Sequence, residues 1–126
     1  RMNSSPTELK FKVAVGRARF LVTFYLGKGY LNADCNCPAG QYGNFCQHRI
    51  KLLRGDGSQI VSDNLDDLVK VVNALPGTGL ESALVEFEVH AGRVTVLRPK
   101  GPSHELDKAE TEFKAARRNL SAMMMA

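Results

Sequence analysis

Residues 35–48 of this 126-residue chain have the sequence Cys35-Asn36-Cys37-Pro38-Ala39-Gly40-Gln41-Tyr42-Gly43-Asn44-Phe45-Cys46-Gln47-His48, which contains all three of its cysteines. An odd number of cysteines this crowded is a poor disulfide framework, because one thiol is left over and a bridge between the first two would be strained. Three thiolates and one imidazole match instead the closed tetrahedral ligand set of structural zinc. We therefore predict that Zn²⁺ is bound by Cys35, Cys37, Cys46 and His48.

A closed ligand set also bears on catalysis. Four protein ligands leave no position for the zinc-bound water that hydrolytic zinc enzymes activate. Cys46 and His48 could be drawn as a nucleophile and its base, but no third group that would orient them is evident. The segment 76–80 lacks the Gly-Lys-Ser/Thr of a phosphate-binding loop. We expect a zinc domain that is not an enzyme and has no small-molecule substrate.

Towards the N-terminus, apolar residues alternate with other residues in three runs. The runs cover residues 9–15, 20–26 and 30–37, with glycine-containing turns at 16–18 and 27–29. This pattern predicts antiparallel strands joined by hairpin turns. The third strand would place Cys35 and Cys37 on one face, ~6.6 Å apart along the chain, before Pro38 ends the strand.

Towards the C-terminus, residues 46–54 are predicted to form a short helix that ends at Gly55-Asp56-Gly57. Cys46 and His48 would lie ~200° apart around a regular helix. Both can therefore reach one ion only if Cys46 lies at the N-cap or in the first turn. At that position the positive end of the helix dipole favours the thiolate of Cys46.

Residues 58–98 are predicted to contain a helix and a second hairpin. The helix would be capped by Ser62 or Asp63 and would end at Pro76-Gly77. Its expected buried stripe is Leu65, Leu68, Val69, Val72 and Leu75. The alternation of Val85, Phe87 and Val89, followed by a turn at 90–93 and a partner strand at 94–97, predicts the hairpin.

A last helix is predicted after Ser103, which would be its cap. Its apolar positions follow a spacing of 3, 4, 3, 4, which gives a narrow seam formed by Leu106, Ala109, Phe113, Ala116 and Leu120. Two alternatives follow from a seam this narrow. The helix is an interaction arm, through which the protein could form a homodimer, or it packs on the second hairpin of its own chain.

Together these elements predict an α+β fold, with small antiparallel strands and short helices around a structural zinc. We expect a disordered N-terminus at 1–7, a zinc-binding unit at 8–57, a helix plus hairpin of the same compact domain at 58–98, and the C-terminal helix at 99–126. Hydrophobic residues at 44% and charged residues at 24% are ordinary for a globular domain. The absence of a long apolar run and of a secretory signal predicts a cytoplasmic protein without a membrane contact.

The ligand pattern resembles the SWIM zinc finger family, whose signature is C-x-C, a variable loop and C-x-H, after a short β-hairpin and before a helix. The resemblance covers residues 20–53, and Pro38 follows the second cysteine as it often does in that family. It implies a ββα zinc unit with a role in DNA or protein binding, since such fingers occur beside helicases, transposases and recombination factors. CDGSH-type iron–sulfur proteins have a similar pattern, but their histidine follows the last cysteine by four positions instead of two. Colour would distinguish the two metals.

The charge of the chain is uneven. Residues 1–54 hold nine Lys and Arg against two acids, whereas residues 55–126 hold eight against eleven. This asymmetry favours an anionic partner for the first half of the chain, often nucleic acid. Taken with what the resemblance implies, we expect nucleic-acid binding, DNA in particular, in a DNA-processing or transcription-related assembly. The candidate contacts are Lys10, Lys12, Arg17, Arg19, Lys28, Arg49, Lys51 and Arg54. The alternative is a protein-interaction adaptor with a structural zinc, whose binding would respond far less to salt.

Overall fold

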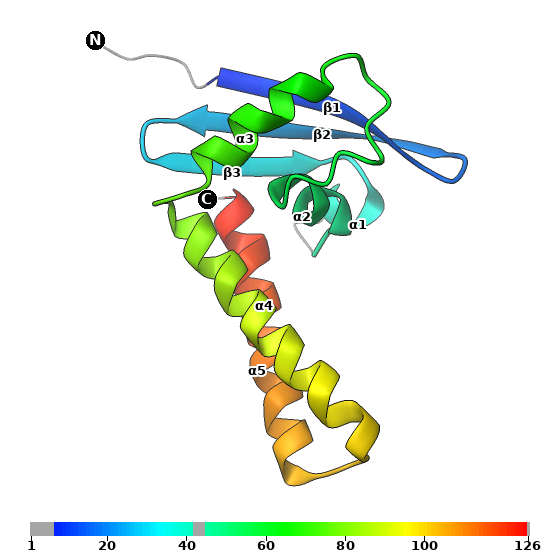
Figure 1. Ribbon diagram of the computed structural model, residues 1–126, viewed down its shortest axis with the longest axis vertical. Helices are drawn as coiled ribbons and strands as arrows, with labels where there is room; N and C mark the ends of the chain where they lie inside the picture. Colours follow the sequence, from blue (N-terminus) through cyan, green and yellow to red (C-terminus); the bar gives the residue numbers. More distant parts are fainter. Residues whose placement is uncertain (1–6, 42–44, 126) are drawn as a thin grey trace.

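The computed structural model describes residues 7–41 and 45–125, which form a sheet followed by helices (Figure 1). Strands β1 (Thr7–Val15), β2 (Ala18–Gly27) and β3 (Tyr30–Cys35) make one antiparallel sheet in the order β1-β2-β3. The helices are α1 (Pro38–Gln41), α2 (Gln47–Leu53), α3 (Leu68–Ala74), α4 (Gly79–Leu97) and α5 (His104–Met125), with 3-10 turns η1 (Leu65–Asp67) and η2 (Arg98–Lys100). The predicted α+β class and the three N-terminal strands are confirmed. Of the predicted disordered N-terminus, residues 1–6 lie outside the described residues, and Thr7 begins β1.

The register of the sheet separates a core face from a charged face. Phe11 pairs with Val22 and Leu9 with Phe24, and the rings of Phe11 and Phe24 meet edge to face with centroids 6.0 Å apart. These side chains are buried together with residues of α2 and α3. Side chains alternate across a strand, so Lys10 and Lys12 project from the opposite face, where both are exposed.

The outer edge of β1 is covered by the segment that leads to α3. The Ala14 amide donates to the carbonyl of Gln59, and the Val61 amide donates to the carbonyl of Lys12, both at 2.8 Å. The side chain of Asn64 donates to the carbonyl of Lys10 at 2.7 Å. An open strand edge is a site for unwanted pairing, and these bonds protect it.

The helix predicted after residue 62 begins later than expected and buries another face. Neither Ser62 nor Asp63 caps it: Asn64 precedes η1, and the Ser62 hydroxyl donates to the Asn64 side chain at 2.6 Å. Leu68 and Val71 are the residues of α3 that reach the core. The predicted stripe is therefore wrong at Leu65, Val69 and Val72, which are exposed.

The second hairpin is also wrong, since residues 79–97 form the single helix α4. The Thr78 hydroxyl caps this helix by accepting from the Glu81 amide at 3.2 Å, and the Glu81 carboxylate accepts from the Gly77 amide at 2.9 Å. Phe87 is buried while its neighbours at two residues' distance, Val85 and Val89, are exposed. The strand-like alternation thus arises from two opposite faces of one helix.

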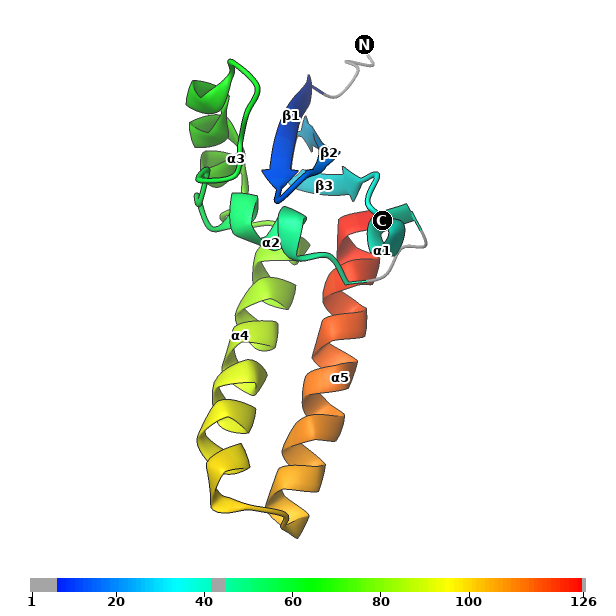
Figure 2. The same ribbon diagram turned by 90° about the vertical axis from the view of Figure 1, so that its right-hand side faces the viewer.

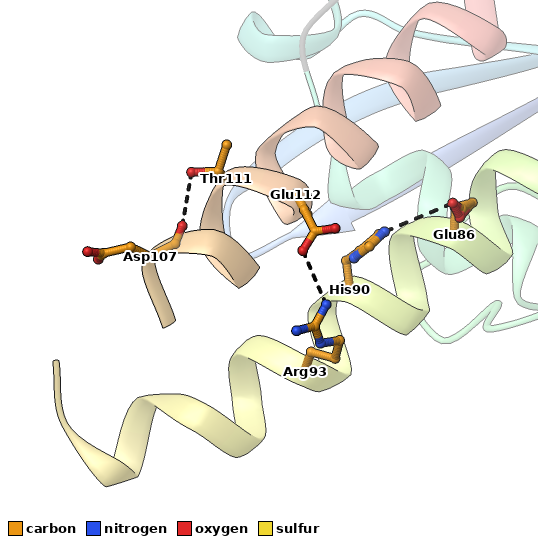
Figure 3. A network of polar contacts seen from close by, with 6 residues as sticks. All are labelled: Glu86, His90, Arg93, Asp107, Thr111 and Glu112. Atoms are coloured by element: carbon orange, nitrogen blue, oxygen red, sulfur yellow. Dashed lines mark hydrogen bonds and ion pairs between the residues drawn. The ribbon is translucent and has the colours of Figure 1, made fainter. Parts of the chain in front are cut away.

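Helices α4 and α5 lie side by side and antiparallel, as a hairpin that extends away from the sheet (Figures 1 and 2). Phe87 of α4 stacks on Phe113 of α5 with centroids 5.3 Å apart, and Arg93 donates to Glu112 at 3.2 Å (Figure 3). As predicted, the Ser103 hydroxyl accepts from the Leu106 amide, at 3.0 Å. The seam of α5 therefore packs on its own chain, on a helix in place of the expected hairpin. Within residues 7–41 and 45–125, no helix combines the length and apolar character of a membrane span.

Candidate metal centre

The four predicted ligands come from three separate places in the fold and meet at one end of the sheet. Cys35 is the last residue of β3, Cys37 precedes α1, Cys46 precedes α2, and His48 lies in the first turn of α2. The three sulfurs and the imidazole nitrogen lie within 4.8 Å of one another. The cysteines are buried and His48 is half-buried, so the site is a closed one within the core.

The distances between the ligand atoms fit a tetrahedral zinc ion. With Zn–S near ~2.3 Å and Zn–N near ~2.0 Å, two sulfurs of a tetrahedron lie ~3.8 Å apart and a sulfur and a nitrogen ~3.5 Å apart. In the structure the sulfurs of Cys37 and Cys46 are 3.5 Å apart. The Nδ1 atom of His48 lies 3.6 Å from the sulfur of Cys35 and 3.4 Å from that of Cys46. The cluster therefore fits Zn²⁺, with Nδ1 as the ligating nitrogen.

The start of α2 brings Cys46 and His48 to the same ion. Cys46 is the N-cap of the helix and has extended backbone angles, φ −138° and ψ 117°, as the sequence analysis required. On the other side of the imidazole, the ring of Phe20 lies with its centroid 4.8 Å from that of His48 at an interplanar angle of 31°. Phe20 on β2 thus restricts the rotation of the ligand.

The turn between β3 and α1 differs from the prediction and depends on two residues that the sequence analysis missed. The strand ends at Cys35 instead of Cys37. Asn36 ties the turn to β2, because its amide donates to the Leu21 carbonyl at 3.1 Å and its side-chain oxygen accepts from the Leu21 amide at 2.7 Å. Gly40 donates its amide to the sulfur of Cys37 at 3.2 Å, and a Cβ at this position would collide with the carbonyl of Cys35.

Arg49 is fully buried beside the ligands, and its guanidinium donates to the carbonyl of Ala33 at 3.2 Å. A zinc ion with three thiolates and a neutral imidazole carries a net charge of about −1. The guanidinium supplies a positive charge close to this group and links α2 to β3. Its prediction as a nucleic-acid contact is wrong, because no part of its side chain reaches the surface.

The hydrogen bonds among the thiols set their ionisation before metal binds. The Cys35 thiol donates to the sulfur of Cys46, and this bond lowers the pKa of Cys46 well below its usual range. The backbone amide and the charge of Arg49 lower that pKa further, whereas burial opposes them. The same bond, together with burial, raises the pKa of Cys35. Cys46 therefore ionises more readily than Cys35, and because zinc binds cysteine as the thiolate, metal binding releases protons.

Comparison with known protein families gives one match, to the SWIM zinc finger, over residues 20–54. These residues are a SWIM zinc finger. The SWIM finger comprises β2, β3, α1 and α2 and contains all four ligands, so this chain includes a zinc-binding SWIM module. No catalytic domain was found beside it. Searches of curated proteins and of solved structures returned no match.

The remaining predicted nucleic-acid contacts are divided between two faces around the SWIM finger. Lys10, Lys12 and Arg19 are exposed on the charged face of β1 and β2, and Arg17 is exposed in the turn between these strands. Lys28 lies in the turn at the opposite end of β2. On the core side of the sheet, Lys51 of α2 lies 3.9 Å from Asp56, and Arg54, which follows α2, forms an ion pair with Glu88 of α4.

Proposed function

We propose that this SWIM module binds nucleic acid, DNA in the first place, within a DNA-processing or transcription-related assembly. The observation that carries the proposal is the charged face of the sheet, where Lys10, Lys12 and Arg19 project together from β1 and β2. Among the described residues, no carboxylate lies within 4.0 Å of the charged groups of Lys12, Arg17 or Arg19. These cations are available for phosphates, which supply most of the affinity of nucleic-acid binding.

The zinc site supports this role by fixing the shape of the sheet. The ligand cluster joins the end of β3 to α2 on the core side of the sheet. Zinc would therefore fix the shape of the sheet, while no residue of the charged face is used as a ligand. Lys51 of α2 and the guanidinium of Arg49 are not part of the proposed surface. The expected compartment is the cytoplasm, where thiols remain reduced and available to zinc.

The test is a titration of the zinc-loaded protein with labelled duplex DNA, single-stranded DNA and RNA of one sequence at several salt concentrations. The variant Lys12→Glu/Arg19→Glu should bind at least ~10-fold more weakly at low salt, with a salt slope smaller by about 2, since each phosphate contact contributes ~0.7–0.9 to the slope. The matched control is Lys114→Glu, an exposed charge reversal on α5. Equal zinc content in all proteins excludes misfolding, and a wild type without salt-dependent binding would reject the proposal.

A protein-interaction adaptor is the second candidate, and one observation favours it. The exposed fractions of Leu65 and Val69 are 53% and 61%, and together with Val72 they border a hollow of about 320 Å³ beside Gly55. Asp66 lies at its rim, so a partner helix with an apolar face and a basic flank would fit. Loss of a specific cross-linked protein partner in Val69→Glu, with nucleic-acid binding absent in the wild type, would establish this candidate instead.

A further inference from the structure

Helix α4 carries a second apolar stripe on the side opposite to α5. Val85, Val89, Gly92 and Val96 follow a spacing of 4, 3, 4, which is that of a helix–helix seam. Val89 lies ~200° around the helix from Phe87, which packs on α5. In the part of the chain that the structure describes, nothing covers the stripe: the exposed fractions of the three valines are 53%, 56% and 60%.

Nothing among the described residues explains a glycine at position 92. It lies inside a 19-residue helix, where glycine is less favourable than alanine, and its backbone does not adopt a positive φ. A Cβ at this position would meet no atom within 4 Å. Glycine also permits close approach of another backbone. Its place in the centre of the valine stripe therefore indicates contact with a helix from outside the described chain.

We propose that this helix is α4 of a second copy, packed antiparallel to the first. In this arrangement Val85 lies opposite Val96 of the second copy, and Val89 lies opposite Gly92 of the second copy. The two-fold axis repeats both contacts, which gives four layers of paired residues. In two of these layers, Val89 of one copy fills the space beside Gly92 of the other. The stripe is thus complementary to itself in the antiparallel direction, as a symmetric dimer interface requires.

The charges beside the stripe are complementary in the same direction. Glu86 and Arg93 lie seven residues apart on one flank of α4, with exposed side-chain fractions of 61% and 46% (Figure 3). Flanking positions of this kind pair across an antiparallel seam, so Glu86 faces Arg93 of the second copy at two equivalent places. Within the chain, Arg93 is held by Glu112 at 3.2 Å, while His90 lies 3.9 Å from Glu86.

A parallel pairing of the same stripes fits less well. Gly92 would face Gly92 and leave a gap, and Glu81 would lie beside Glu86 of the other copy, which brings like charges together. The shape of the molecule also favours the antiparallel arrangement, because the hairpin extends away from the sheet (Figure 2). The two sheets then lie at opposite ends of the paired helices, each with its zinc finger and charged face accessible.

One pair of helices of this length is expected to bury less than the ~1,200 Å² typical of stable complexes. The dimer should therefore dissociate on dilution. Sedimentation equilibrium of the zinc-loaded full chain from ~1 µM to ~1 mM covers the range of dissociation constants that such an interface allows. We expect the mass to rise from 13.8 kDa towards twice that value. A wild type that stays monomeric over this range would reject the proposal and assign the stripe to a different occupant.

The variant Gly92→Ala separates dimer formation from folding. The added methyl group meets no atom of the described residues within 4 Å, so the thermal midpoint should stay equal or rise. The dimer dissociation constant should increase at least ~10-fold, because Val89 of the second copy can no longer approach. Val89→Glu should be monomeric. The matched control Val61→Glu replaces a valine of similar exposure outside α4 and should leave the dimer unchanged. A Gly92→Ala protein with the wild-type association constant would contradict the inference.

Charge reversal tests the direction of pairing. Glu86→Arg should weaken an antiparallel dimer, and the double variant Glu86→Arg/Arg93→Glu should restore it, since the swapped charges again face each other. In a parallel dimer Glu86→Arg would strengthen association through Glu81 of the other copy. Strengthening by Glu86→Arg, or no recovery in the double variant, would therefore overturn the antiparallel arrangement. None of these outcomes depends on nucleic-acid binding.

Discussion

The ring of Phe20 lies against the imidazole of His48, with centroids 4.8 Å apart, and so holds a metal ligand from the strand side. We expect Phe20→Ala to lower zinc affinity by ~10-fold or more, as substitutions that free a metal-bound histidine do. Competition with a chromophoric chelator measures this affinity. Tyr25→Ala, on the opposite face of the same strand, is the control and should retain wild-type affinity.

Removal of zinc should unfold the region around the ligands. We expect one zinc per chain and a colourless protein, and chelation should lower the thermal midpoint, because metal binding contributes ~10–16 kcal/mol in small zinc fingers. Elemental analysis, an absorption spectrum and a thermal melt make the three measurements. Iron, a visible absorption band or an unchanged midpoint after complete zinc removal would disprove the structural zinc.

Gly40→Ala should disturb the metal site without touching a ligand. The new Cβ would displace α1 from the carbonyl of Cys35 and weaken the amide bond from residue 40 to the sulfur of Cys37. We expect faster zinc transfer to a chelator and a lower thermal midpoint. Pro38→Ala, at an exposed position of the same short helix, should behave as the wild type.

Arg49→Gln should lower the free energy of unfolding by ~3 kcal/mol or more, since it removes a buried charge that faces the thiolates. Lys51→Gln, two residues away on the same helix but partly exposed, should change it by no more than ~0.5 kcal/mol. Urea denaturation of the zinc-loaded proteins compares the two. Similar midpoints for both variants would mean that Arg49 is not needed for stability.

The C-terminal helix should be indispensable for folding. Leu120 and Met124 of α5 are buried in the same core as the sheet, so Leu120→Ala should cost ~2–5 kcal/mol. A chain truncated after Pro102 would expose Phe87 and Leu84 and should lose its cooperative melt. Lys114→Ala, on the exposed side of α5, is the control for the point variant. A truncated protein that keeps the wild-type midpoint would show that the helix is a dispensable arm.

The sequence by itself determined the metal site and the sheet that carries it. Three cysteines and a histidine within 14 positions share metal binding as their explanation. The alternation of 9–15, 20–26 and 30–37 indicates strands because glycines separate the runs, although the third strand ends at residue 35. The angle per residue placed Cys46 at the N-cap or in the first turn of a helix, and the structure has it at the N-cap. Local spacing was sufficient here because each ligand lies close in sequence to the element that positions it.

Tertiary structure decided which faces are buried. Arg49 looked like a surface cation, but the carbonyl of Ala33 and the nearby thiolates compensate its charge in the core. The run from Val85 to Val96 looked like a hairpin because two opposite sides of one helix both carry large apolar residues. The local signal for that helix was Thr78 followed three positions later by Glu81, which is the pattern of a capping box. Only the packing of α5 through Phe113 distinguishes these two sides. The periodicity of a sequence shows how apolar residues are spaced along the chain. Which of them are buried depends on which helix or strand packs against them.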